Sequence, residues 1–211
     1  CRRQICPAGQ TFRVRRMSFI IVFALQVFLN GFTETFLLNS ESFFQPWRFV
    51  TSIFLHGGLG HLIFNLFALL LFGSILESLI GGRKFLIVFF VTGILANLIA
   101  VNFYPSSLGA SGAIFGVIGA LIVVRPLLVV WAFGLPMPIF IAGILWVIGD
   151  LVGLFVPSNV GNIAHLSGIF FGLILGLLYR KKAPRVTRHK PKMDEGTARR
   201  WEDSYFNLRK L

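Results

Sequence analysis

Six long runs of apolar residues follow one another along this chain, and they constrain its fold more than any other feature. They cover residues 17–38, 59–80, 84–104, 109–125, 134–156 and 161–179. A helix needs about 20 apolar residues to cross the hydrocarbon core of a bilayer. Hydrophobic residues make up 55% of the chain, far more than a soluble domain of this size carries. We therefore predict an all-α polytopic membrane protein, a bundle of six transmembrane helices. Asn30 interrupts the first run, and its helix is expected either to continue or to end near that residue.

The basic residues predict how the helices are oriented. The chain carries 20 Lys and Arg and a net charge of +12, but these residues flank the apolar runs and form no folded basic surface for nucleic acid. With six spans, all of them except Arg48 fall on one side, which predicts cytoplasmic N- and C-termini. Residues 1–16 are then a basic cytoplasmic segment, residues 17–179 the membrane domain, and residues 180–211 a basic tail that contacts anionic lipid.

The two cysteines, Cys1 and Cys6, lie at the extreme N-terminus and cannot crosslink the membrane core. No second Cys/His pair is nearby, so a zinc site is not expected. We expect no metal and no cofactor. Residues 1–16 also lack the apolar centre that a cleavable signal peptide requires.

A serine stands among small residues at the start of the fourth run, in Gly109-Ala110-Ser111-Gly112. Glycines recur from there on one helical face, which lets another backbone approach closely. A serine in such a stripe is often only a small packing residue. A hydroxyl inside a membrane is nevertheless costly without a partner, so the partner of Ser111 becomes the question.

The sixth run supplies a partner for the serine. It begins Ala164-His165-Leu166-Ser167-Gly168, and glycines follow His165 on one face. Two glycine-faced helices that pack together can bring Ser111 and His165 within hydrogen-bond reach, as a nucleophile and its base.

The second run adds two polar residues at the same predicted depth. His61 and Asn65 are four residues apart and share a helical face. Alone they are most simply explained as hydrogen-bond donors and acceptors that hold helices together. Next to Ser111, they are placed to donate to a developing oxyanion, and the Ser111 N–H is a third donor.

Two further residues of the apolar runs have competing explanations. Phe115, one turn after Ser111, either stacks on His165 or packs in the core. Asp150 in the fifth run is an intramembrane acid, and such residues are functional candidates. From its position we expect it well below the level of Ser111, either paired with a polar group or facing the cytoplasmic half, so that no acid lies near His165.

These motifs together resemble the rhomboid intramembrane serine proteases over about residues 17–179. The matching residues are Trp47-Arg48 in the first loop (31–58, an expected interfacial segment), His56 with His61 and Asn65, Gly109-x-Ser111-Gly112, and Ala164-His165-x-x-Gly168 with Gly172. The resemblance implies a Ser111 nucleophile, a His165 base, an oxyanion hole from Asn65, His61 and the Ser111 N–H, and no required acid. Phe115 stands where relatives often have tyrosine, and Ser52 where some bacterial members have histidine.

The activity that the resemblance implies is hydrolysis of peptide bonds in or near transmembrane segments, through an acyl-enzyme. The partners are then transmembrane substrates and the lipid bilayer, with no nucleic acid, in what we expect to be the plasma membrane. A small transporter is the alternative of another class, but it predicts polar residues along whole helices. A catalytically inactive relative is a third alternative, and it is expected to lack the serine or the histidine. Substrates are expected to enter from the lipid past the fifth run.

Overall fold

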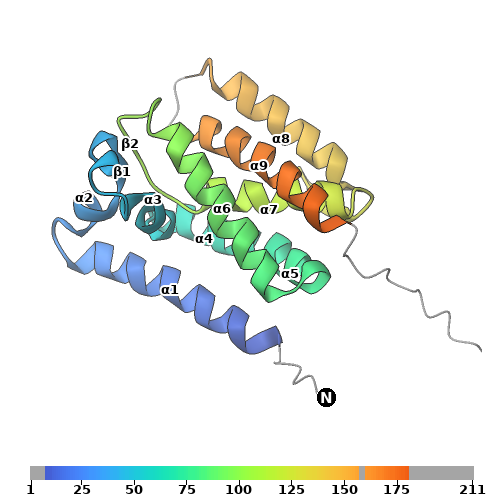
Figure 1. The fold of residues 1–211 in the computed structure, drawn as a ribbon, viewed down its shortest axis with the longest axis horizontal. Coiled ribbons are helices and arrows are strands. Elements are labelled where there is room, and N and C mark those ends of the chain that lie inside the picture. The colour runs from blue at the N-terminus through green and yellow to red at the C-terminus, as the bar shows by residue number, and fades with distance from the viewer. Residues whose placement is uncertain (1–7, 157–159, 181–211) are drawn as a thin grey trace, which may run out of the picture.

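The computed structural model describes residues 8–156 and 160–180, which form a helical bundle (Figure 1) and two small two-stranded sheets. The α-helices are α1 (Ala8–Phe28), α2 (Phe32–Phe36), α3 (Arg48–Thr51), α4 (Leu59–Ala68), α5 (Ser74–Ile80), α6 (Gly82–Ala100), α7 (Ser111–Val124), α8 (Ile139–Gly153) and α9 (Asn162–Arg180). The 3-10 turns are η1 (Ser40–Phe43) and η2 (Ser52–Phe54), and η3 (Leu69–Gly73) is a π-helical turn that joins α4 to α5. The strands are β1 (Leu38–Asn39), β2 (Ser106–Ser107), β3 (Val129–Ala132) and β4 (Leu135–Pro138).

Each predicted apolar run contains a helix, but the helices differ in length. Three are long and apolar enough to cross a membrane: Leu59–Ile80, Gly82–Ala100 and Asn162–Arg180. The apolar helices of the other runs are shorter, at Met17–Phe28, Ser111–Val124 and Ile139–Gly153. The architecture is a helical membrane bundle, and the number of six spans stays a prediction.

Two of the predicted runs are not continuous helices. The first run breaks after Phe28, close to the expected alternative end at Asn30, and its remainder forms α2 and part of β1. The start of the fifth run is β4, which pairs with β3 in register Val129↔Pro138 and Trp131↔Pro136. Prolines at 136 and 138 disfavour helix here, so α8 begins only at Ile139.

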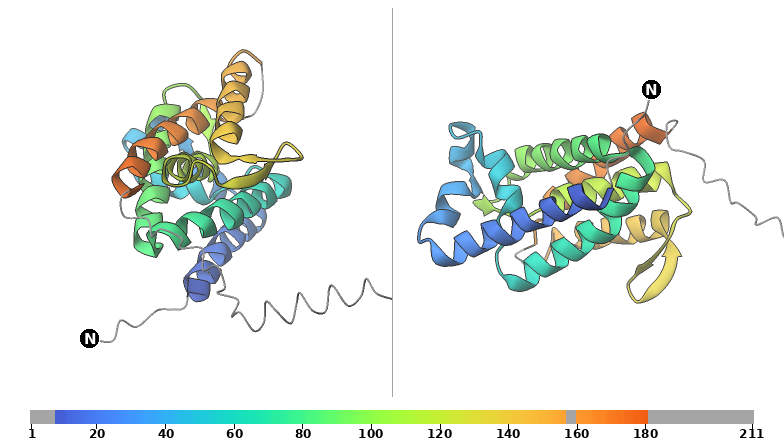
Figure 2. Two further views of the ribbon diagram at one scale, coloured as in Figure 1. Left: turned by 90° about the vertical axis from the view of Figure 1, so that its right-hand side faces the viewer. Right: turned by 90° about the horizontal axis from the view of Figure 1, so that it is seen from below.

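The helix α7 lies at the centre of the bundle, and the other long helices surround it (Figure 2). Most of its residues are buried, and its most extensive contact is with α9. Glycine is what permits this contact. A Cβ atom built on Gly168 would overlap the carbonyl oxygen of Gly112, and one on Gly172 would overlap that of Gly116. The two backbones therefore touch directly, which orders the first turns of both helices relative to each other.

The connecting segments carry exposed aromatic residues at both ends of the bundle. In the first loop Phe43, Phe44 and Trp47 are exposed, as expected for an interfacial segment. In the β3–β4 hairpin, Trp131 and Phe133 are exposed, and Phe133 adopts a left-handed conformation at the turn (φ 54°). The predictions made for Cys1, Cys6 and the tail beyond Arg180 lie outside the described residues.

Candidate active site

The first turns of α7 and α9 bring Ser111 and His165 to the same contact between helices. Ser111 is the first residue of α7, and His165 is the fourth of α9. Between them, a Cβ atom built on Gly112 would lie 3.4 Å from the Ala164 carbonyl oxygen and 3.6 Å from the Ala164 Cβ. Ser111 and His165 are the chain neighbours of these two touching residues.

The ring of His165 packs on the face of α7 that carries Ser111. Phe115 stands four residues after Ser111 and so shares its helical face. The Phe115 and His165 rings stack with centroids 4.2 Å apart and planes 8° from parallel. Trp146 of α8 meets the Phe115 ring edge-on at 6.3 Å. The stacking alternative for Phe115 is thus the observed one.

Asp150 contacts His165, which corrects an expectation from the sequence. Its Oδ1 lies 3.0 Å from His165 Nδ1, and the two side chains are 8% and 12% exposed. The acid does pair with a polar group, but the expectation that it lies well below Ser111, with no acid near His165, is wrong. The α8 helix ends at Gly153, so Asp150 occupies its last turn, at the end of the bundle where α9 begins.

His61 lies against the backbone that leads into Ser111. Its Nδ1 accepts a hydrogen bond from the Gly57 N–H (3.3 Å), which leaves the ring proton of the neutral side chain on Nε2. A Cβ atom built on Gly109 would come 3.0 Å from that Nε2. His61 therefore presents an N–H donor close to the start of α7.

Gly109 has a conformation that suits this close approach. Its φ of 125° lies in the region that favours glycine, and a side chain there would meet the His61 ring. Its N–H donates to the Ser52 carbonyl oxygen (2.9 Å), and the Ser52 hydroxyl accepts from the Asn97 side chain (3.0 Å). The first loop and α6 thus hold the turn that precedes Ser111.

Asn65 is buried one turn below His61. Its side-chain amide donates one hydrogen to the His61 carbonyl oxygen (2.8 Å), in the preceding turn of the same helix. An amide has two hydrogens, so Asn65 keeps a second donor.

His56 supports His61 from the loop before α4. The two rings meet edge-to-face at 5.1 Å. The His56 N–H donates to Gln26 Oε1 (2.9 Å), which ties the loop to α1, and its Nδ1 contacts the Phe54 carbonyl oxygen (3.1 Å). Burial, and secondarily the neighbouring His61, lower the pKa of His56 to about 4, so this ring is neutral near pH 7.

Trp47 and Arg48 make their contacts within the first loop. Arg48 is buried, donates to Gln45 Oε1 (2.8 Å) and the Leu37 carbonyl oxygen (3.4 Å), and pairs with Glu41 (3.5 Å). Trp47 is half exposed. These contacts fit a role in holding the loop together.

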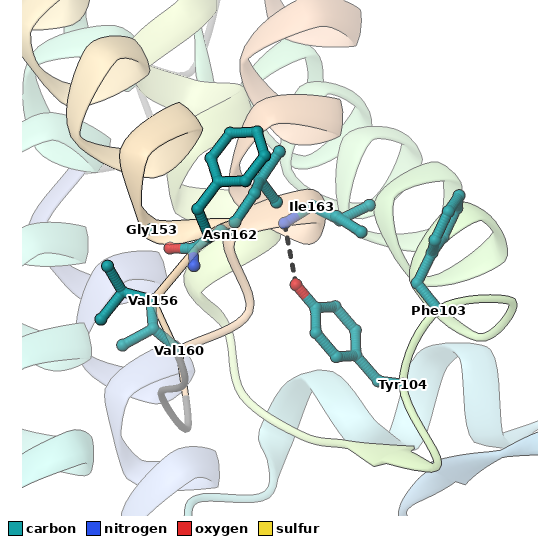
Figure 3. Close-up of a pocket in the computed structure, with 9 residues that line it drawn as sticks. Phe103, Tyr104, Gly153, Val156, Val160, Asn162 and Ile163 are labelled. Carbon is teal, nitrogen blue, oxygen red and sulfur yellow. Dashed lines mark hydrogen bonds between the residues drawn. The ribbon is translucent and has the colours of Figure 1, made fainter.

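A surface pocket of about 380 Å³ lies beside the connection between α8 and α9 (Figure 3). Tyr104, which follows α6, reaches across it, and its hydroxyl accepts the Ile163 N–H (3.1 Å). This bond satisfies a backbone donor in the first turn of α9, two residues before His165. Tyr104 and the contact of Asp150 were both missed from sequence. An acid inside an apolar run was the available signal for Asp150.

The fold is a membrane bundle of apolar helices that gathers a serine, histidines and an acid at one end. A family model described as "Rhomboid domain" matches residues 44–182. YdcA of Bacillus subtilis (strain 168) is 34% identical, over 66% of this chain and 70% of its own length. The chain belongs to the rhomboid family, which is known for intramembrane proteases.

Other relatives are longer or more distant. Rhomboid protease GlpG of Yersinia pseudotuberculosis is 27% identical over 71% of this chain and 54% of its own. "RHOMBOID-like protein 6, mitochondrial" of Arabidopsis thaliana is 29% identical over 64% of this chain. The matched segment spans 44% of that Arabidopsis protein.

Proposed function

We propose that this chain is a serine endopeptidase that hydrolyses peptide bonds in or near transmembrane segments of other membrane proteins. The observation that carries the proposal is the His165 ring, which is stacked on the α7 face that bears Ser111, where the α7 and α9 backbones touch. Family membership supports the reaction class.

In the proposed reaction Ser111 Oγ attacks the substrate carbonyl carbon while its proton passes to His165 Nε2. The tetrahedral oxyanion accepts hydrogen bonds from His61 Nε2, Asn65 Nδ2 and the Ser111 N–H. Collapse of this intermediate breaks the C–N bond, and His165 returns its proton to the leaving amine. Water then attacks the Ser111 ester and gives a proton to His165. Collapse of this second intermediate breaks the ester C–O bond, and His165 gives its proton to Ser111 Oγ, which restores the serine hydroxyl and releases the acid product.

The substrate class follows from the depth of this chemistry in the membrane domain. A helical peptide bond has its carbonyl oxygen engaged, so the segment must unwind before attack. We propose substrates with Gly, Ala or Ser near the cleaved end of a transmembrane segment, where glycine weakens a helix by about 1 kcal/mol relative to alanine.

The topology that we propose has both termini in the cytoplasm and the protein in the plasma membrane. It is supported by the distribution of Lys and Arg, of which only Arg48 falls on the opposite side. This topology puts Ser111, His165 and His61 near the outer surface.

Labelling with a fluorophosphonate probe tests the function without a known substrate. Purified protein in detergent should be labelled, while Ser111→Ala and His165→Ala should not. Ser167→Ala is a matched control, because Ser167 also precedes a glycine in a glycine-rich helix and is buried. It should label like the wild type. Labelling that survives Ser111→Ala would reject the proposed nucleophile, and loss of labelling in Ser167→Ala would point to Ser167 instead.

A further inference from the structure

The contact between Asp150 and His165 goes beyond a site made of a serine and a histidine. We propose that Asp150 is a positioning residue, which orients His165 and stabilises the positive charge that the ring gains when it takes the serine proton. The inference rests on the proposed function of Ser111 and His165.

Asp150 contacts Nδ1 of His165, and this contact decides which ring nitrogen of the neutral histidine carries the proton. Its Oδ1 is 3.0 Å from Nδ1, so the carboxylate accepts the Nδ1 proton and leaves Nε2 as the base. Phe115 covers one ring face at 4.2 Å. An acceptor on one edge and a stack on one face restrict the rotation of the imidazole, and that restriction is what a proton acceptor requires.

Burial of Asp150 is difficult to explain by stability alone. The residue is 7% exposed, and among the described residues its Oδ2 has no hydrogen-bond partner. A buried carboxylate with one unpaired oxygen costs desolvation energy, and apolar replacements of such groups are often neutral or stabilising. The same burial makes its field on His165 strong, because little water screens it.

Asp150 reaches His165 from a helix that is held differently from α7 and α9. Those two helices touch through their backbones at Gly168 and Gly172. At Gly143 and Gly153, α8 instead meets the side chains of Ile122 and Asn162. The acid therefore contacts His165 only while the end of α8 stays in place, so the position of α8 affects the orientation of His165.

The test compares variants by the rate constant (kinact) and apparent affinity (KI) of fluorophosphonate labelling in the purified full chain. Asp150→Asn has the same size but no charge, and Asp150→Glu keeps the charge in a larger side chain. We expect Asp150→Asn to lower kinact by about 10-fold to 10⁴-fold with little change in KI, the upper end being the loss in soluble triad proteases with the equivalent change. Asp150→Glu should retain more of the rate than Asp150→Asn.

Two further variants separate this role from a structural one. Asp150→Leu removes the unpaired oxygen and should unfold at the wild-type temperature or above while labelling slowly. Glu77→Gln is the matched control, because it also neutralises a buried acid. Glu77 lies in α5, at the opposite end of the α4–α5 segment from His61, so this variant should label normally.

The outcomes distinguish this inference from the function on which it rests. If Ser111→Ala is inert and folded Asp150→Asn or Asp150→Leu labels at the wild-type rate, the role of Asp150 is wrong and the serine mechanism stands. If Ser111→Ala labels normally, the proposed function itself fails. If Asp150→Asn labels with a higher kinact than Asp150→Glu, the size of the side chain governs the rate and its charge does not.

Discussion

Phe115 and His165 stack almost parallel, with ring centroids 4.2 Å apart, across the contact between α7 and α9. An aromatic pair of this kind contributes about 0.5–1.5 kcal/mol beyond its buried area. Because Trp146 also meets Phe115, the stack links α7, α8 and α9 at the candidate site.

This stack predicts that the ring of Phe115 matters for activity and that a hydroxyl on it does not. Phe115→Leu should slow fluorophosphonate labelling by about 10-fold. Without the stack His165 is less well oriented, and a rise of about 1.4 kcal/mol in the activation free energy corresponds to that factor. Phe115→Tyr keeps the ring and should label at the wild-type rate. Equal rates for Phe115→Leu and the wild type would exclude an orienting role for the ring.

The oxyanion assignment predicts a graded loss. Removing one of several donors typically costs about 100- to 1,000-fold in rate. Asn65→Ala should therefore retain weak cleavage of a transmembrane substrate, with nearly unchanged KM. The alternative role, a hydrogen bond that only stabilises the fold, predicts a lower unfolding temperature with normal activity per folded molecule. Measuring both quantities on one preparation decides between them.

The backbone contact of α9 with α7 predicts that two similar glycine substitutions have different effects on stability. Gly172→Ala inserts a methyl group into the Gly116 carbonyl oxygen and should lower the unfolding temperature clearly, since overpacking costs about 1–3 kcal/mol. Gly149 of α8 has no atom within 4 Å of a built Cβ, and Gly149→Ala should leave stability unchanged or raise it by about 0.5–1 kcal/mol. Thermal unfolding in detergent measures both, and a stable Gly172→Ala would contradict the close contact.

The pKa of His56 predicts how stability changes with pH. In the folded protein this pKa is about 4, below the ordinary value of 6.5. The unfolded chain therefore binds the proton more tightly, so the free energy of unfolding falls as the pH drops from 6.5 toward 4, by at most about 1.4 kcal/mol per pH unit. The unfolding temperature should fall less between pH 7 and pH 5 in His56→Gln than in the wild type. Identical pH dependence in the two proteins would rule out His56 as the source.

We expect α8 to move when substrate enters, because at Gly143 and Gly153 it meets side chains, whereas α7 and α9 touch through their backbones. The side chain of Asn162 meets Gly153, so Gly153→Cys with Asn162→Cys, in a Cys1→Ser, Cys6→Ser background, should form a disulfide that ties α8 to α9. The oxidised protein should cleave transmembrane substrates slowly and still react with the small probe. Substrate cleavage that proceeds equally fast before and after reduction would show that α8 does not need to move there.

Several features of this protein were predictable from sequence because they depend on local pattern. Runs of about 20 apolar residues require burial in a membrane wherever they lie in the fold, and the glycine stripes after Ser111 and His165 require a close helix contact. The motifs around His61, Ser111 and His165 identified the rhomboid family, which the family model confirms. The roles of these residues in catalysis stay predictions.

The position of Asp150 depended on the tertiary structure, because three distant features decide it. The β3–β4 hairpin takes residues 135–138 out of the fifth run, α8 ends at Gly153, and the packing of α8 against α9 turns the carboxylate toward His165. None of these follows from the apolar pattern. That pattern identifies a membrane span, but it does not specify where the helix ends or which of its residues lies level with His165. The sequence determined that a serine and a histidine share one helix contact in a membrane bundle, and only the packing of a third helix decided that an acid joins them.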